Sequence, residues 1–87
     1  MYELKFAPAF VEEYEKLDSS VKKRINKKLF QLKHQQMKRR HLRLGEPYFV
    51  EEIGQYRIVY MFLEKEKKIV LEFVGMHKDY EKFLGID

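Results

Sequence analysis

Three β-rich segments follow one another between residues 47 and 76, and they constrain the fold of this chain more than any other feature. The segments read PYFVEEI, GQYRIVYMFLEKE and KKIVLEFVGM, with short turns at Gly54-Gln55 and around residues 64–68. Sequential strands joined by short turns pair as an antiparallel meander. The second half of the chain therefore predicts a small sheet.

Arg57 lies in the middle strand of this meander, where side chains alternate between two faces. The more apolar face carries Ile53, Tyr56, Ile58, Tyr60 and Phe62. We expect that face to pack on helices, which leaves Arg57 on the open side. A two-residue turn at Gly54-Gln55 also sets Glu52 opposite Arg57. The pair is either part of a site or a surface ion pair worth about 0 to 1 kcal/mol.

The last strand leads into a cluster of polar side chains. Unbroken alternation puts one set of its residues on a single face: Ile69, Leu71, Phe73, Gly75 and His77. A histidine at a strand end is more often a surface residue than a catalyst. Here Arg57, Lys78 and Tyr80 can converge beside it, as phosphate chemistry would require.

The first half of the chain predicts one strand and two helices. YELKF, residues 2–6, alternates as a short strand, and a helix over residues 8–17 begins with Pro8. A break at residues 18–20 opens a second, basic helix, whose apolar stripe is Val21, Ile25, Leu29 and Leu32. The order β-α-α-β-β-β predicts a single α+β domain over residues 1–87, with a helical hairpin packed on a small, mainly antiparallel twisted sheet. A short tail carrying Tyr80, Phe83 and Leu84 packs back on that sheet.

Composition excludes several classes of protein. The chain has no cysteine, so disulfide scaffolds, thiolate zinc sites and thiol nucleophiles are ruled out. His34, His41 and His77 lack the spacing of a metal site, and no glycine-rich phosphate loop is present. No apolar run approaches the roughly 20 residues of a membrane span, so we expect a soluble, cytoplasmic protein without membrane contacts.

A net charge of +4 favours polyanionic or acidic partners. The densest basic cluster is KRRHLR, with Lys38, Arg39, Arg40, His41 and Arg43. It is either a solvated helix end or a phosphate-binding rim.

Two motifs resemble the RelE/ParE superfamily of toxins from toxin–antitoxin pairs, in the RelE-like branch. The first is GQYRIVY, with Gly54, Tyr56, Arg57 and Tyr60 at the family positions, and the second is Gly75-x-His77-x-x-Tyr80. The resemblance covers most of the chain. It implies an endoribonuclease that cuts messenger RNA at the ribosome and inhibits translation, with no metal or cofactor. It also implies a RelB-like antitoxin as partner, and a monomer or homodimer when the toxin is free.

The resemblance also assigns roles to residues. Arg57 would stabilise the scissile phosphate, His77 would act as general acid or base, and Tyr80 would assist. The basic cluster and Lys78 would bind RNA.

The acidic pair Glu51-Glu52 stands where another branch has lysines. Either Glu52 or Glu51 accepts the 2′-OH proton, or Glu52 neutralises Arg57. The alternative is a ParE-like gyrase inhibitor, or a catalytically weak relative that acts only through antitoxin binding.

Overall fold

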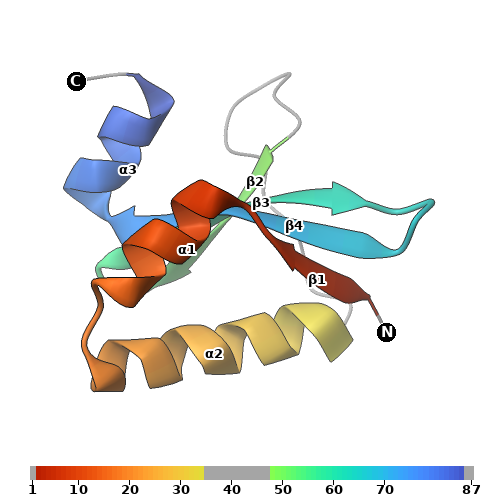
Figure 1. Ribbon diagram of the computed structural model, residues 1–87, viewed down its shortest axis with the longest axis horizontal. Helices are drawn as coiled ribbons and strands as arrows, with labels where there is room; N and C mark the ends of the chain where they lie inside the picture. Colours follow the sequence, from red (N-terminus) through yellow and green to blue (C-terminus); the bar gives the residue numbers. More distant parts are fainter. Residues whose placement is uncertain (1, 35–47, 86–87) are drawn as a thin grey trace.

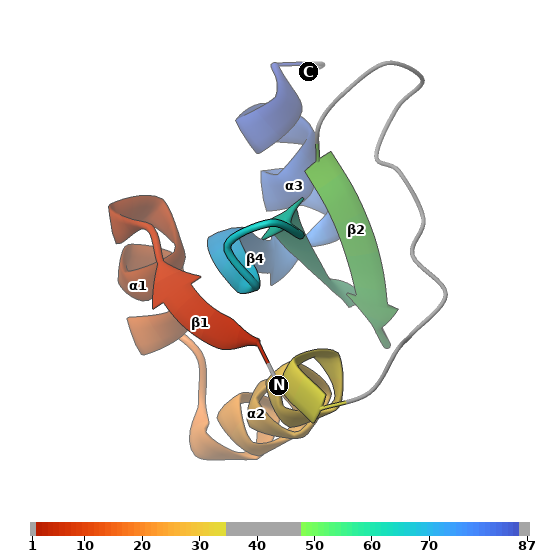
Figure 2. The same ribbon diagram turned by 90° about the vertical axis from the view of Figure 1, so that its right-hand side faces the viewer.

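A four-stranded mixed sheet forms the centre of the molecule in the computed structural model, which describes residues 2–34 and 48–85. Its strands are β1 (Glu3–Phe6), β2 (Tyr48–Ile53), β3 (Tyr56–Leu63) and β4 (Lys68–Met76), in the spatial order β1-β4-β3-β2 (Figures 1 and 2). The pairs β2-β3 and β3-β4 are antiparallel, and β1 adds to β4 in parallel. The predicted meander and the mainly antiparallel sheet are confirmed.

In the described part of the chain three helices accompany the sheet: α1 (Pro8–Glu15), α2 (Ser19–His34) and α3 (His77–Leu84). Figure 1 shows α1 and α2 next to each other on one side of the sheet and α3 at the end of β4. The hydroxyl of Tyr14 in α1 donates a hydrogen bond to Asn26 Oδ1 in α2, at 2.7 Å. The helix predicted over residues 8–17 ends earlier, at Glu15. None of these three helices is long and apolar enough to cross a membrane.

Asp18 fixes the start of α2. Its carboxylate accepts a hydrogen bond from the backbone N–H of Val21 at 2.9 Å and another from the Ser20 hydroxyl at 2.8 Å. Because a helix leaves its first N–H groups unsatisfied, this is the usual position for an aspartate. The two hydrogen bonds also hold the pKa of Asp18 below its ordinary value. The prediction that a short polar side chain opens the second helix is confirmed for Asp18, but the break lies at residues 16–18, and Ser19 and Ser20 already belong to α2.

The core lies between the sheet and the first two helices. Phe10 from α1 and the whole stripe of α2 meet one face of β3 and β4, through Ile58, Tyr60, Ile69, Leu71 and Val74. Ile53, Tyr56 and Phe62 pack around that cluster. The prediction that the apolar face of the middle strand packs on the helices is confirmed. It places Arg57 on the other face.

One sequence prediction about the sheet was wrong. Val59 pairs with Phe73, whereas Tyr60 pairs with Leu71, so Glu72 is an extra residue in β4 with no partner in the ladder. Such a β-bulge reverses the alternation beyond it. Ile69 and Leu71 therefore face the helices, and Phe73 faces the same side as Arg57. The bulge also brings Gly75 opposite Arg57.

Candidate functional site

Arg57, His77 and Tyr80 meet where β3 begins and β4 passes into α3. The guanidinium Nη1 of Arg57 contacts Nδ1 of His77. Its Cζ atom lies 5.0 Å from the centre of the Tyr80 ring, in a cation–π arrangement. The predicted convergence of these three side chains is found in the structure.

Glu52 completes the surroundings of Arg57. It is the cross-strand partner of Arg57, as the turn predicted, and its Oε1 lies 3.6 Å from Arg57 Nη2. The Arg57 side chain is 24% exposed and that of Glu52 is 47% exposed. The arginine is thus approached by an imidazole, a carboxylate and an aromatic ring, yet remains within reach of solvent.

The partners of His77 determine which ring nitrogen carries the proton. A guanidinium can only donate, so His77 Nδ1 accepts the hydrogen bond from Arg57. The proton of the neutral ring then belongs to Nε2, which lies 2.8 Å from Glu81 Oε1. The carboxylate of Glu81 therefore orients the imidazole. The sequence analysis missed Glu81, although its position four residues after His77 on a helix is the available signal.

A ring stack anchors α3, which carries these side chains. Phe83 stacks on Phe73 with ring centres 4.8 Å apart. Phe73 is available on this face because the bulge at Glu72 turns it away from the helical core. The bulge therefore positions both the Gly75 backbone opposite Arg57 and the helix that holds His77. The expected packing of Phe83 on the sheet is confirmed.

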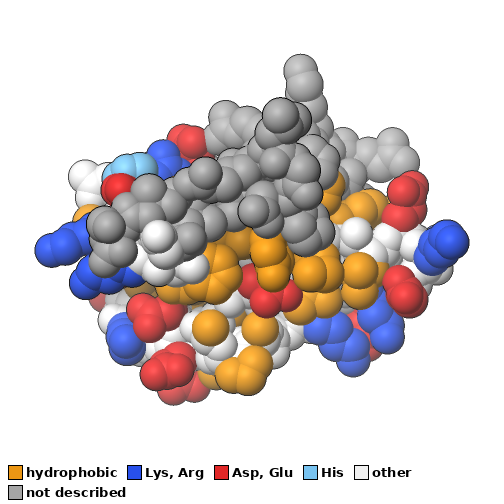
Figure 3. All heavy atoms as spheres, turned by 90° about the horizontal axis from the view of Figure 1, so that it is seen from above, with side chains coloured by type: hydrophobic (Ala, Val, Ile, Leu, Met, Phe, Trp, Pro, Cys, Tyr) orange, Lys and Arg blue, Asp and Glu red, His pale blue; other side chains and the backbone are white. Residues whose placement is uncertain are grey.

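A hollow of about 510 Å³ opens beside Arg57. It is lined by the turn residues Gly54 and Gln55, by Arg57 and by residues 76–79. Lys78, predicted to bind RNA, is therefore in this lining. Lysine and arginine side chains lie beside a histidine at the left end of Figure 3, where Figure 1 places α3 and the β2-β3 turn.

Arg24 of α2 also reaches this region. Gly54 has a positive φ of 59°, and a Cβ built there would overlap the Arg24 guanidinium. The positive φ favours glycine. The Arg24 guanidinium, as the end of a flexible side chain, could move aside for a larger residue. The sequence analysis missed Arg24, because nothing in the helical periodicity separates it from its basic neighbours.

Other predicted residues lie elsewhere. Glu51 is on the opposite face of β2 from Glu52, and its Oε1 lies 3.7 Å from Lys28 Nζ. It is therefore not the carboxylate beside Arg57. The basic cluster of Lys38, Arg39, Arg40, His41 and Arg43 lies outside the described residues. Within residues 2–34 and 48–85, no group of three or more potential ligand side chains could hold a metal ion.

Comparisons with known proteins place this geometry in context. No family model and no curated protein matches the sequence. Among solved structures, a chain of the Escherichia coli RelBE toxin–antitoxin complex superimposes with a TM-score of 0.77 and 24% identity, covering 87% of this chain and 96% of that one. The isolated E. coli RelE toxin superimposes with a TM-score of 0.74 and 23% identity, and the match covers 98% of this chain and 97% of that one. This chain has the RelE fold.

A third RelE-like match is the RelBE2 toxin–antitoxin complex from Mycobacterium tuberculosis, with a TM-score of 0.77 and 18% identity. It covers 87% of this chain and 91% of that one. The match to isolated RelE spans 98% of this chain, so it takes in α3 with His77 and Tyr80. The fold predicted from the two motifs is confirmed.

Proposed function

We propose that this protein is a RelE-like toxin that cuts messenger RNA at the ribosome and so inhibits translation. The observation that carries the proposal is the contact between Arg57 and His77, with Glu52 on one side and Glu81 behind the imidazole. These groups supply a fixed cation, a proton donor and a proton acceptor at one place on a RelE fold.

Cleavage would proceed by attack of a ribose 2′-oxygen on the neighbouring phosphorus. Glu52 accepts the 2′-OH proton, the 2′-oxygen bonds to phosphorus, and the bond from phosphorus to the 5′-oxygen breaks. His77 gives its proton to that departing oxygen. The products are a 2′,3′-cyclic phosphate and a free 5′-hydroxyl. Arg57 stabilises the negative charge that builds on the phosphate oxygens.

The resting contact between Arg57 and His77 must open for this reaction. In the free protein His77 Nδ1 accepts from Arg57, so it holds no proton to give. A substrate phosphate is a stronger acceptor for the guanidinium than a neutral imidazole. We infer that phosphate draws Arg57 Nη1 away and frees Nδ1 to take up a proton from solvent water, which it later delivers to the 5′-oxygen.

The proposal includes an antitoxin partner. The similar structures from E. coli and M. tuberculosis are toxin–antitoxin complexes. The net charge of +4 suits an acidic partner that would shield this chain until it is released.

Cleavage of messenger RNA on programmed ribosomes tests the function. General acid–base groups contribute about 10² to 10⁴-fold, so His77→Ala should cut that much more slowly. Arg57→Ala should lose about 10² to 10³-fold, the scale of a lost charge-stabilising donor.

His34→Ala is the matched control, because His34 packs against Phe30 at the end of α2 and this variant should cut like the parent. Parent-like cutting by His77→Ala and Arg57→Ala would refute the assigned roles. A parent that leaves ribosome-bound messenger RNA intact but blocks gyrase supercoiling would instead favour a ParE-like function.

A further inference from the structure

The hollow beside Arg57 extends past the catalytic side chains, and basic residues flank it. Lys78 lies in its lining. Arg24 lies against Gly54, which is also in the lining. The two cations come from α2 and α3 and meet the hollow from different elements.

These cations differ from Arg57 in their surroundings. Arg57 contacts His77, Glu52 and Tyr80. Both Arg24 and Lys78 are exposed, and neither forms an ion pair with any residue in 2–34 or 48–85. An unpaired cation can bind an anion without first giving up a partner. The flanks of the hollow are therefore the more available anion-binding positions.

The remaining lining suits a base. Met76 is a large exposed side chain, 43% accessible, whose polarizable thioether packs well on flat rings. Gln55 offers an amide and Asp79 a carboxylate, groups that hydrogen-bond the edges of unpaired bases. The volume of about 510 Å³ falls within the range of roughly 300 to 1,000 Å³ found for small-ligand pockets.

We propose that this hollow holds the nucleotide next to the cut phosphate in a single RNA strand. Its base lies against Met76, and its flanking phosphates bind Arg24 and Lys78. The inference rests on the proposed function, because it places the subsite beside the phosphate that Arg57 would hold. A nucleotide suits the hollow better than an acidic peptide does, since it supplies an anion, a flat ring and polar edges within one unit.

Salt-dependent binding tests the two cations. The probe is a short, labelled single strand of 2′-O-methyl RNA, which has no free 2′-OH and is not cut. The logarithm of the binding constant falls with the logarithm of salt concentration by about 0.7 for each phosphate contact on a single strand. Arg24→Ala and Lys78→Ala should each reduce the slope by about that amount.

Lys5→Ala is the charge-matched control, because Lys5 lies on β1, at the opposite edge of the sheet from β2. It should keep the parent slope. Slopes for Arg24→Ala and Lys78→Ala that equal the control would overturn the inference, as would no binding by the parent at low salt.

Abasic scanning tests the base. Removing the base that occupies the hollow should weaken binding to the parent by up to about tenfold, the upper scale of a contact between a thioether and a ring. Removing the same base should weaken binding to the Met76→Ala variant much less than it weakens binding to the parent. If no position in the probe is sensitive, or if an acidic peptide displaces the RNA through Met76, the surface is not a nucleotide subsite.

The binding assay separates this inference from the proposed function. If the parent cuts ribosome-bound RNA but the salt slopes of Arg24→Ala and Lys78→Ala equal that of the parent, the proposed function stands and the subsite is refuted. A parent that binds the probe as expected but cuts nothing keeps the subsite and loses the function.

Discussion

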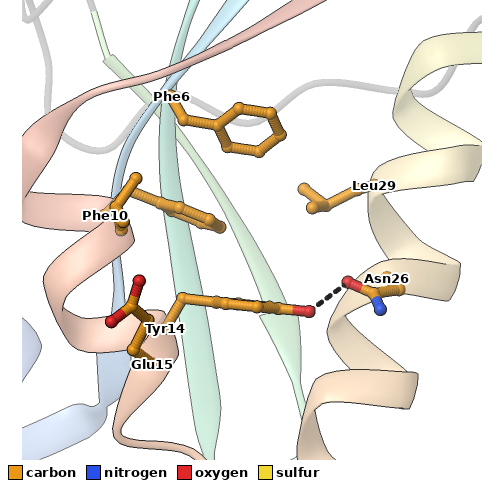
Figure 4. A pocket seen from close by; sticks show the side chains of 7 residues that line it. Phe6, Phe10, Tyr14, Glu15, Asn26 and Leu29 are labelled. Atoms are coloured by element: carbon orange, nitrogen blue, oxygen red, sulfur yellow. Dashed lines mark hydrogen bonds between the residues drawn. The ribbon is translucent and has the colours of Figure 1, made fainter.

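Two hollows on the described surface differ in what lines them. The hollow beside Arg57 contains several charged and polar side chains and brings together residues from the β2-β3 turn, β3, β4 and α3. The groove between α1 and α2, of about 310 Å³, is lined mainly by Phe6, Phe10, Val11, Tyr14 and Leu29. Figure 4 shows the rings of Phe6, Phe10 and Tyr14 one after another on one side, with Leu29 and Asn26 opposite them on α2.

The two linings indicate different roles: the groove contributes to packing, and the hollow carries groups that could take part in chemistry. In the groove, the Tyr14 hydroxyl is engaged with Asn26, and the other contacts are apolar. In the hollow, Arg57 holds contacts that a phosphate can replace. Substitutions of buried side chains in the groove should therefore change stability. Substitutions around the hollow should change activity with little effect on stability.

The largest effect on stability should come from Phe10→Ala. Phe10 is 2% exposed and belongs to the core that joins both helices to the sheet. Loss of a buried phenylalanine costs about 3 to 5 kcal/mol. Urea unfolding of the purified parent and variant measures this loss in the free energy of unfolding.

Val11→Ala is the control for Phe10→Ala, because Val11 lines the same groove but is 41% exposed. Its free energy of unfolding should stay within about 0.5 kcal/mol of the parent. Equal losses in the two variants would show that the burial of Phe10 is not what sets the cost of its removal.

Glu81→Gln should give the next largest effect, on activity alone. We expect Glu81 to orient His77 without touching substrate, so its removal should cost about 10 to 100-fold, as removal of the partner of a metal-bound histidine does. The cutting rate on ribosomes should fall. The midpoint of thermal unfolding should not change. Glu66→Gln, in the exposed β3-β4 turn, is the matched control.

A double variant separates positioning from a general structural role. If Glu81 acts through His77, then Glu81→Gln should cause no further loss in a protein that already carries His77→Ala. A full additional loss in that background would show that Glu81 acts by another route.

The sequence predicted more of the fold than of the candidate site. The Gly54-Gln55 turn fixes the pairing of Glu52 with Arg57, because a two-residue hairpin allows one register. The bulge at Glu72 left no signal, since β4 is apolar on both faces and reads equally well in either alternation. Its position depends on how β3 and the helices pack together.

Contacts between elements that are distant in the sequence also could not be predicted from local sequence patterns. Arg24 and Gly54 come together only when α2 crosses the β2-β3 turn, and no spacing in the sequence records that approach. Glu51 and Glu52 are neighbours in sequence, but alternation sends one to Lys28 and the other to Arg57. The register of β2 therefore decides which carboxylate belongs to the site.

The smallest effect we expect is a pH-dependent one on the helical side, at Asp18. Hydrogen bonds from Val21 and Ser20 hold the pKa of Asp18 below its ordinary value, so its contribution to stability is present above the unfolded pKa. That contribution is lost as the pH falls through the folded pKa. Asp18→Ala should lower the urea midpoint at neutral pH, and the difference from the parent should shrink in acid.

Ser19→Ala is the control for Asp18→Ala, because Ser19 is exposed in the first turn of the same helix. Its midpoint should follow that of the parent at every pH. A difference between Asp18→Ala and the parent that persists unchanged in acid would mean that the aspartate acts through its shape rather than its charge. Cutting by Asp18→Ala should match the parent at neutral pH, since α2 meets the hollow only through Arg24.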